Sequence, residues 1–191
     1  MLDLLNRQES RHIITIEDPI EFRHTSQRSV VQQRQVGKDT ESFSSGLRHA
    51  LRQDPDVIML GELRDLETIR TALTAAETGH LVLGTLHSAD TAGAIHRIVD
   101  VFPADQQAQI RSQLALSLRG IASQQLLALG DGVVPAVEVL IASDAVRNLI
   151  REEKTHQLLS VIETSAELGM QSMNQARAQL GLSSTREPRR S

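Results

Sequence analysis

Short apolar runs alternate with amphipathic stretches along most of the chain, and this alternation predicts its secondary structure. The runs IITI, VIML and LVLGTL are rich in isoleucine, leucine and valine, which is typical of buried parallel strands. Between them lie TESFSSGLRHALRQD and DLETIRTALTAAETG, whose apolar residues recur at helical spacing. The pattern therefore predicts an α/β fold with a mostly parallel sheet and helices on both faces.

The pattern changes in the second half of the chain. A helix is expected over ADQQAQIRSQLALSLRG, and IASQQLLAL and VVPAVEVLIA are predicted to form a strand pair joined by the turn GDG. Amphipathic helices follow. We expect a sheet-containing core over residues 1–142, a C-terminal helical segment over 143–182 and a disordered tail over 183–191.

Composition narrows the functional classes. The chain has 191 residues, of which 40% are apolar, and it has no cysteine, which excludes disulfides and zinc–thiolate sites. A net charge of −4 and only three aromatic residues, all phenylalanine, argue against nucleic-acid binding. Since no apolar run approaches the roughly 18 residues of a membrane span and the first residues do not form a signal peptide, we expect a cytoplasmic protein.

Ionisable residues follow three of the apolar runs. Glu17 and Asp18 end the first run, Glu62 ends the second and His87 ends the third. The carboxyl ends of parallel strands share one edge of a sheet, where such folds bind ligands. A carboxylate at that edge is costly to desolvate unless a cation or donor meets it. The sequence therefore predicts a site there, although a solvated acidic turn and a helix-capping Glu62 are simpler explanations.

Three of these segments resemble boxes of the secretion ATPase superfamily, which drives type II and type IV secretion and type IV pili. ITIEDPIE (14–21) resembles its Asp box, DPDVIMLGELRD (54–65) its Walker B box and TGHLVLGTLHS (78–88) its His box. DAVRNLIREEK (144–154) is similar to a motif of the pilus retraction branch, which acts in twitching motility.

The resemblance implies a RecA-like P-loop NTPase core with additional C-terminal helices. It implies a hexameric ring of identical subunits that uses ATP and Mg²⁺. It also implies a pilus or secretion platform protein of the inner membrane as partner, a cytoplasmic location beside that membrane, and no nucleic-acid ligand.

The resemblance also assigns roles to residues. Glu62 would be catalytic, holding Mg²⁺ through water and polarising the attacking water, with Glu21 as a second essential carboxylate. The nucleotide and Mg²⁺ site would further contain Glu17, Asp18, Gly61, His80 and His87. The two histidines, about 23 Å apart along one strand, cannot bind one metal ion.

Two further groups of residues are candidates. Four arginines flank the boxes and either reach phosphate across a subunit boundary or form ordinary ion pairs: Arg48, Arg64, Arg70 and Arg97. The resemblance assigns a motif to retraction rather than hydrolysis: Ala145, Arg147, Asn148, Leu149, Ile150 and Arg151. The same pattern also describes an ordinary amphipathic packing helix.

The phosphate-binding loop of the family, GxxxxGK[ST], does not occur in this sequence. The single glycine–lysine pair is Gly37–Lys38, with Gln32 in place of the first glycine and Asp39 in place of the hydroxyl residue. We therefore expect the loop to lie upstream of residue 1, which leaves open whether this chain alone is an enzyme. Three functions remain: the ATPase-core portion of a hexameric retraction motor, an inactive interaction module of that motor, or a RecA-like DNA motor.

Overall fold

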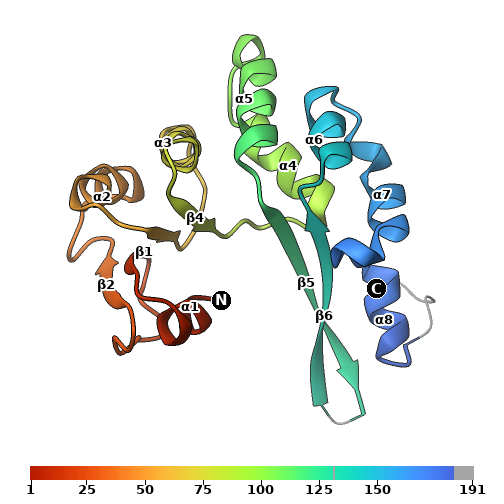
Figure 1. The fold of residues 1–191 in the computed structure, drawn as a ribbon, viewed down its shortest axis with the longest axis horizontal. Coiled ribbons are helices and arrows are strands. Elements are labelled where there is room, and N and C mark those ends of the chain that lie inside the picture. The colour runs from red at the N-terminus through yellow and green to blue at the C-terminus, as the bar shows by residue number, and fades with distance from the viewer. Residues whose placement is uncertain (131, 183–191) are drawn as a thin grey trace, which may run out of the picture. The chain divides into compact units, whose positions relative to one another are not determined.

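The computed structural model describes residues 1–130 and 132–182, which form two compact units (Figure 1). The first unit contains residues 1–87 and 101–103, and the second contains residues 88–100 and the chain from 104 onward. The division expected between residues 142 and 143 lies inside the second unit. The tail expected over 183–191 lies outside the described residues.

A four-stranded parallel sheet forms the centre of the first unit. The strand order is β2-β1-β3-β4, and every neighbouring pair is parallel, which confirms the predicted sheet. The elements of this unit are α1 (Leu2–Gln8), β1 (His12–Glu17), β2 (Val30–Gln35), α2 (Phe43–Ala50), a 3₁₀ turn (Leu51–Gln53), β3 (Val57–Leu60), α3 (Leu66–Glu77) and β4 (Leu81–Gly84).

The alternation of side chains along β1 and β3 builds the core. Ile14 and Ile16 of β1 share one face of the sheet with Ile58 and Leu60 of β3, and they pack with residues of α2 and α3. All four isoleucine and leucine side chains are fully buried. Residues of the opposite face, such as Ile13, are buried as well. This burial on both faces explains why the strands are continuous apolar runs.

Two helices of this unit, α2 and α3, begin at residues whose side chains cap them. The Ser42 side chain accepts a hydrogen bond from the Ser45 backbone N–H at the start of α2. The Asp65 carboxylate accepts one from the Thr68 N–H at the start of α3, at 2.8 Å. Each bond satisfies a backbone donor that has no partner within the helix. Serine and aspartate are among the residue types preferred at this position.

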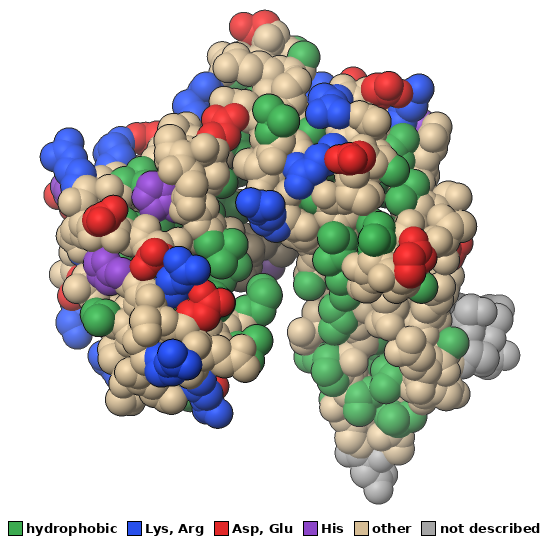
Figure 2. Space-filling model, in the orientation of Figure 1, with side chains coloured by type: hydrophobic (Ala, Val, Ile, Leu, Met, Phe, Trp, Pro, Cys, Tyr) green, Lys and Arg blue, Asp and Glu red, His purple; other side chains and the backbone are tan. Residues whose placement is uncertain are grey.

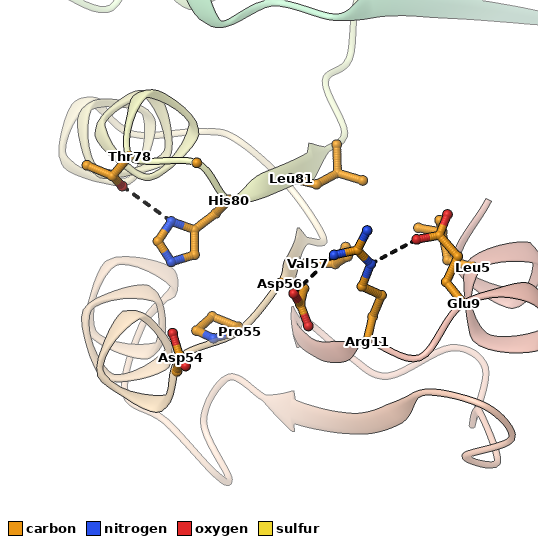
Figure 3. A pocket seen from close by; sticks show the side chains of 11 residues that line it. Leu5, Glu9, Arg11, Asp54, Pro55, Asp56, Val57, Thr78, His80 and Leu81 are labelled. Atoms are coloured by element: carbon orange, nitrogen blue, oxygen red, sulfur yellow. Dashed lines mark hydrogen bonds and ion pairs between the residues drawn. The ribbon is translucent and has the colours of Figure 1, made fainter.

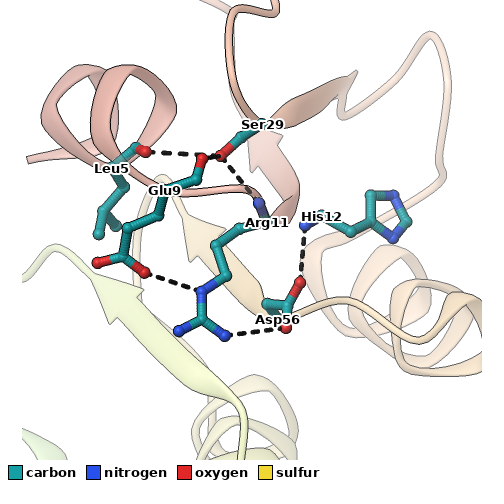
Figure 4. A network of polar contacts seen from close by, with 6 residues as sticks. All are labelled: Leu5, Glu9, Arg11, His12, Ser29 and Asp56. Atoms are coloured by element: carbon teal, nitrogen blue, oxygen red, sulfur yellow. Dashed lines mark hydrogen bonds and ion pairs between the residues drawn. The ribbon is translucent and has the colours of Figure 1, made fainter.

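A polar network joins the amino ends of β1 and β3 (Figure 4). The Arg11 guanidinium donates to Glu9 at 2.8 Å and to Asp56 at 3.2 Å, and the His12 backbone N–H donates to Asp56 at 2.8 Å. The His12 N–H, followed by Arg11, lowers the pKa of Asp56 below its usual 3.8. Because the folded-state pKa is lowered, the resulting stabilisation is present above pH 3.8 and is lost as the pH falls further.

The second unit is a helical assembly around a hairpin. β5 (Gly120–Leu129) and β6 (Gly132–Ile141) pair antiparallel over their whole length, which confirms the predicted strand pair. Hydrophobic side chains gather over this hairpin in the view of Figure 2, and Leu126 and Val133 are about two-thirds exposed. The other elements are α4 (Thr91–Asp100), α5 (Ala104–Ser117), α6 (Asp144–Arg151), a 3₁₀ turn (Thr155–Gln157), α7 (Leu158–Thr164), a second 3₁₀ turn (Ala166–Leu168) and α8 (Met173–Gln179).

None of the described helices combines the length and apolar character that a membrane crossing requires.

Candidate active site at the carboxyl edge of the sheet

The carboxyl ends of β1, β3 and β4 are joined by hydrogen bonds just beyond the last paired residues. The Gly61 N–H donates to the Ile16 carbonyl at 2.8 Å, and the Leu63 N–H donates to the Thr85 carbonyl at 3.0 Å. The Thr85 hydroxyl in turn donates to the Gly61 carbonyl. A Cβ added at Gly61 would lie 3.2 Å from the Glu17 Cα, so a side chain there would crowd β1. Glycine therefore permits the close approach that holds the edge together.

Glu62 projects from this edge with its carboxylate engaged on both oxygens. The Arg64 Nε donates to Oε2 at 2.7 Å, and His87 Nε2 lies 3.2 Å from Oε1. The Glu62 side chain is 16% exposed, whereas His87 is 75% exposed. The hydrogen bond between Arg64 and Glu62 raises the pKa of Arg64. The structure thus brings together Glu62, His87 and Arg64, from two strand ends that are far apart in the sequence.

Glu17 is at the same edge but turns inward. Its Oε1 accepts hydrogen bonds from the Thr15 hydroxyl at 2.5 Å and from the Gln33 side-chain amide at 3.0 Å. Thr15 is fully buried and Glu17 is 8% exposed. Thr15 and Gln33 were not singled out from the sequence. The two-residue spacing of Thr15 and Glu17 was an available signal, because it places both side chains on one face of a strand.

Replacing Thr15 with valine tests the contribution of this bond. The change preserves the shape of the side chain but leaves a buried carboxylate with one donor fewer, so we expect the unfolding free energy to fall by about 1–3 kcal/mol. Chemical denaturation at neutral pH measures the loss, and Thr15→Ser, which retains the hydroxyl, is the matched control. A valine variant as stable as the parent protein would show that the hydroxyl contributes nothing.

The other acidic candidates of the first box are more open. Asp18 and Glu21 are both exposed, and Asp18 precedes Pro19 through a cis peptide bond. The charge of Asp18 contributes to the raised pKa of Arg64, so its carboxylate belongs to the electrostatic surroundings of Glu62. Glu21 lies in the loop between β1 and β2. The described contacts do not join Glu21 to Glu62.

His80 lies at the opposite end of β4 from His87. Its Nδ1 is 3.0 Å from the Ala75 carbonyl and 3.3 Å from the Thr78 hydroxyl, which fixes the ring against the end of α3. It lines a cavity of about 490 Å³ at the amino edge of the sheet, together with Arg11 and Asp56 (Figure 3). This cavity is at the other end of the strands from Glu62, and His80 therefore does not contact the candidate site.

The four candidate arginines have different surroundings. Arg64 is the one that reaches Glu62. Arg48 of α2 pairs with Glu67 of α3, and the Arg70 guanidinium lies 5.1 Å from the centre of the Phe102 ring. Arg97 is exposed on α4 in the second unit. Arg48 and Arg70 thus have contacts that support the first unit, whatever further role they have in an assembly.

The Gly37–Lys38 segment forms a self-contained turn. The backbone N–H of Gly37 donates to Thr40, and those of Lys38, Asp39 and Thr40 donate to the Gln35 carbonyl. A phosphate-binding loop requires successive backbone N–H groups that point at the ligand. Here these donors are used within the turn, so the segment does not offer a phosphate cradle.

The chemistry of the edge suits Mg²⁺ held through water rather than a closed metal site. Among the described residues, no group of three or more His, Cys, Asp or Glu side chains is placed to hold a metal ion. Mg²⁺ commonly keeps several waters and binds through one or two carboxylates together with substrate phosphates. Glu62, a single carboxylate at the strand ends, fits that role.

The motif that the resemblance assigns to retraction lies on α6 and is divided between two faces. Val146 and Ile150 are buried. The Arg147 guanidinium donates to the carbonyls of Leu116 at 2.8 Å and Leu118 at 3.0 Å, and also to the Ala115 carbonyl. Arg147 therefore caps the C-terminal end of α5, a role that the sequence pattern alone did not predict.

The outward-facing part of this motif lines a groove. Ala145, Asn148 and Leu149 contribute to a depression of about 660 Å³, together with residues of α7 and the turn before it. Arg151 donates to Asn148 within the helix.

Comparisons with known proteins agree with these features. The family model described as Type II/IV secretion system protein matches residues 1–132. The type IV pilus retraction ATPase PilT of Pseudomonas aeruginosa is 56% identical over 91% of this chain and 51% of its own length. The twitching motility protein of Neisseria gonorrhoeae is 53% identical over 92% of this chain and 48% of its own length. The chain thus spans about half the length of these curated relatives.

A solved structure shows the same fold. The crystal structure of the pilus retraction motor PilT with bound ADP superimposes with a TM-score of 0.86 at 55% identity. The match covers 94% of this chain and 51% of the PilT chain.

Proposed function

The chain belongs to the type II/IV secretion system protein family, and on that premise we propose that it is the hydrolytic half of the ATPase core of a hexameric motor that retracts type IV pili. The observation that carries this proposal is Glu62, held at the carboxyl edge of a parallel sheet by Arg64 and His87. In α/β folds this edge is where ligands bind. Relatives described as a retraction ATPase and a twitching motility protein share more than half of their aligned residues with it.

Each residue at this edge has a distinct role in the proposed reaction. When bound, Mg²⁺-ATP supplies the phosphoryl group and the cation that neutralises its charge. Glu62 orients the attacking water and accepts its proton at a carboxylate oxygen. Arg64 and His87 orient the Glu62 carboxylate, each through one of its oxygens. One of the two side chains must release its carboxylate oxygen so that a water molecule can bind there. Asp18 adds negative charge near Arg64. Glu17 faces the interior and accepts a hydrogen bond from Thr15 of the same strand.

The edge of β4 that has no partner in the described part of the chain is evidence for a further strand, supplied by another part of the protein. β2, at one edge, contains glutamines and an arginine, as edge strands usually do. β4, at the other edge, is the apolar run LVLG, has β3 as its strand neighbour in the described part of the chain, and leaves Leu81 37% exposed. An apolar parallel strand normally has neighbours on both sides. We place the strand that precedes the phosphate-binding loop beside β4.

Assembly and location follow from the same proposal. The chain would work in a ring of identical subunits at the cytoplasmic side of the inner membrane, against a pilus or secretion platform protein.

A hybrid protein tests the proposal. Residues 1–191 would be fused behind the N-terminal portion of the Pseudomonas PilT relative, and ATP hydrolysis would be compared with that of residues 1–191 alone. We expect Mg²⁺-dependent hydrolysis from the hybrid and no micromolar ATP binding by residues 1–191. The backbone N–H groups and the lysine of a phosphate-binding loop provide most phosphate affinity, and residues 1–191 do not contain the sequence of such a loop.

The outcomes separate the three candidate functions. A folded hexameric hybrid that binds ATP without hydrolysing it would replace the proposal with an inactive interaction module. Salt-sensitive DNA binding by the hybrid would favour the DNA motor instead. A hybrid carrying the homologous PilT segment in place of residues 1–191 is the matched control for both assays.

A further inference from the structure

Gln33 of β2 is a half-buried polar side chain of the first unit that none of the three boxes contains. It lies opposite Thr15 in the register of β1 and β2. Its Nε2 donates hydrogen bonds to Glu17 Oε1 at 3.0 Å and to the Phe22 carbonyl at 2.9 Å. Its Oε1 accepts one from the His24 backbone N–H at 2.8 Å. One side chain thereby joins the end of β1 to the loop that follows it.

The partners of Gln33 match the hydrogen-bonding groups of its amide. A glutamine side chain has two N–H donors and one carbonyl oxygen. Both donors meet acceptors, at Glu17 and Phe22, and the oxygen meets the His24 N–H. A glutamate at this position would turn a second carboxylate toward Glu17, and like charges repel. The arrangement is therefore built for an amide.

The segment between these contacts carries two of the candidate carboxylates. Residues 18–21 run from Glu17 to Phe22, and the same Nε2 group of Gln33 bonds both of these flanking residues. Asp18 is the first residue of the segment and Glu21 is the last. Gln33 therefore closes this short segment at both of its ends.

The segment begins in the electrostatic surroundings of Glu62. The charge of Asp18 contributes to the raised pKa of Arg64, whose Nε donates to Glu62. The Gly61 N–H donates to the Ile16 carbonyl at 2.8 Å, which fixes the ends of β1 and β3 to each other. A displacement of Asp18 relative to β1 would therefore change the charge around Arg64.

The later part of the same loop is held by a different side chain. Asn6 of α1 is 1% exposed. Its Nδ2 donates to the Thr25 carbonyl at 2.8 Å, and its Oδ1 accepts from the Gln27 N–H at 3.0 Å. The loop between β1 and β2 is thus attached through Gln33 near its start and through Asn6 near its end. The Gln27 amide is consequently an internal reference for changes at Gln33.

We propose that Gln33 is a positioning residue, which fixes the segment 18–21 and with it the Asp18 and Glu21 carboxylates at the edge that carries Glu62. Because one amide holds both flanking residues, its loss should release the segment as a whole, while the backbone pairing of β1 and β2 remains. The inference rests on the proposed function for what the two carboxylates do, but its first test requires no nucleotide.

Gln33→Met in the full chain tests the inference by nuclear magnetic resonance and amide hydrogen exchange. Methionine has nearly the same length but no amide. We expect the His24 amide to exchange roughly tenfold faster, because it loses its acceptor. The carboxyl carbon signals of Asp18 and Glu21 should move, whereas the Gln27 amide should exchange as in the parent protein.

The matched control is Gln32→Met, the same change at the neighbouring, exposed position of β2. It should leave the exchange rate of the His24 amide within about twofold of the parent and the Asp18 and Glu21 signals in place. In Gln33→Met, faster His24 exchange with unchanged carboxyl signals would make Gln33 a local brace of the loop and overturn the inference. An unchanged His24 exchange rate would overturn it as well.

The hybrid protein adds a readout that a local brace would not change. We expect Gln33→Met to lower its kcat by about 10–100-fold, because a small displacement of a reacting group is enough for such a loss, and to leave its ATP affinity unchanged. Gln33→Asn, whose amide is on a side chain one carbon shorter, is the second variant in case the methionine protein does not fold. Smaller changes in the same direction are expected from it.

The inference and the proposed function fail separately. A folded Gln33→Met hybrid with the parental kcat would overturn the positioning role. A parental hybrid that does not hydrolyse ATP would remove the proposed function, and the carboxyl signals of Asp18 and Glu21 would still decide whether Gln33 positions them.

Discussion

Replacing Glu62 with glutamine is expected to lower the kcat for ATP hydrolysis by about 10²–10⁴-fold in the hybrid protein. The amide has nearly the same shape but cannot accept the proton of the attacking water. Its neutral head also binds Arg64 less strongly. ATP binding should change little, because phosphate affinity resides mainly in the loop supplied by the other half of the hybrid. Steady-state hydrolysis and equilibrium nucleotide binding, measured on the same protein, separate the two effects.

The control for this variant is Glu67→Gln. Glu67 is an exposed carboxylate of α3 that pairs with Arg48 of α2. It is near Glu62 in the sequence but does not contact it in the described structure. We expect its kcat to stay within about twofold of the parent, since exposed ion pairs contribute little. A Glu62→Gln hybrid with the parental kcat would remove Glu62 from the mechanism and leave the proposed function without its principal residue.

Ile58→Ala is expected to reduce the unfolding free energy by about 2–5 kcal/mol. Ile58 is fully buried at the centre of β3, paired with Ile14 on one side and Val82 on the other, and Glu62 follows on the same strand. Removing its outer carbons leaves a cavity between the sheet and its helices. Urea unfolding followed by circular dichroism measures the loss, and hydrogen exchange of the β1 amides assigns it to the first unit.

Two further variants calibrate this effect. Ile58→Val should cost about 0.5–1.5 kcal/mol, because it removes a single methyl group. Val30→Ala, at a β2 residue that is 56% exposed, should cost less than 1 kcal/mol. An Ile58→Ala loss no larger than that of Val30→Ala would contradict the core described for the first unit.

The sequence predicted the framework of the site because its signals are local. Apolar runs ending in ionisable residues predict parallel strands, and parallel strands bring their carboxyl ends to one edge whatever their order. Glu62 and His87 are therefore expected at the same edge, although their strands are far apart in the sequence. In the structure these two strand ends are joined by the hydrogen bond from Thr85 to Gly61, which are 24 positions apart. The strand pair around the glycine turn and the caps of α2 and α3 follow from equally local patterns.

Contacts between distant segments required the tertiary structure. The direction of the Glu17 carboxylate depends on Gln33, in the neighbouring strand. Arg147 lies in a motif that the resemblance assigns to retraction, and it caps α5, about 30 residues earlier in the chain. The partners of Glu17 and Arg147 cannot be deduced from sequence spacing, because a long side chain can reach donors and acceptors on several other segments.

By itself, the sequence of this protein determined the parallel sheet and the edge of the sheet that carries Glu62 and His87. The segments that contain these two residues also indicated the family. The tertiary structure alone decided which carboxylates are exposed and which are buried, and that the two units divide after His87. The physical reason is the range of the interactions. Strand and helix patterns arise from residues a few positions apart, whereas a buried charge is stabilised by donors that only folding brings to it.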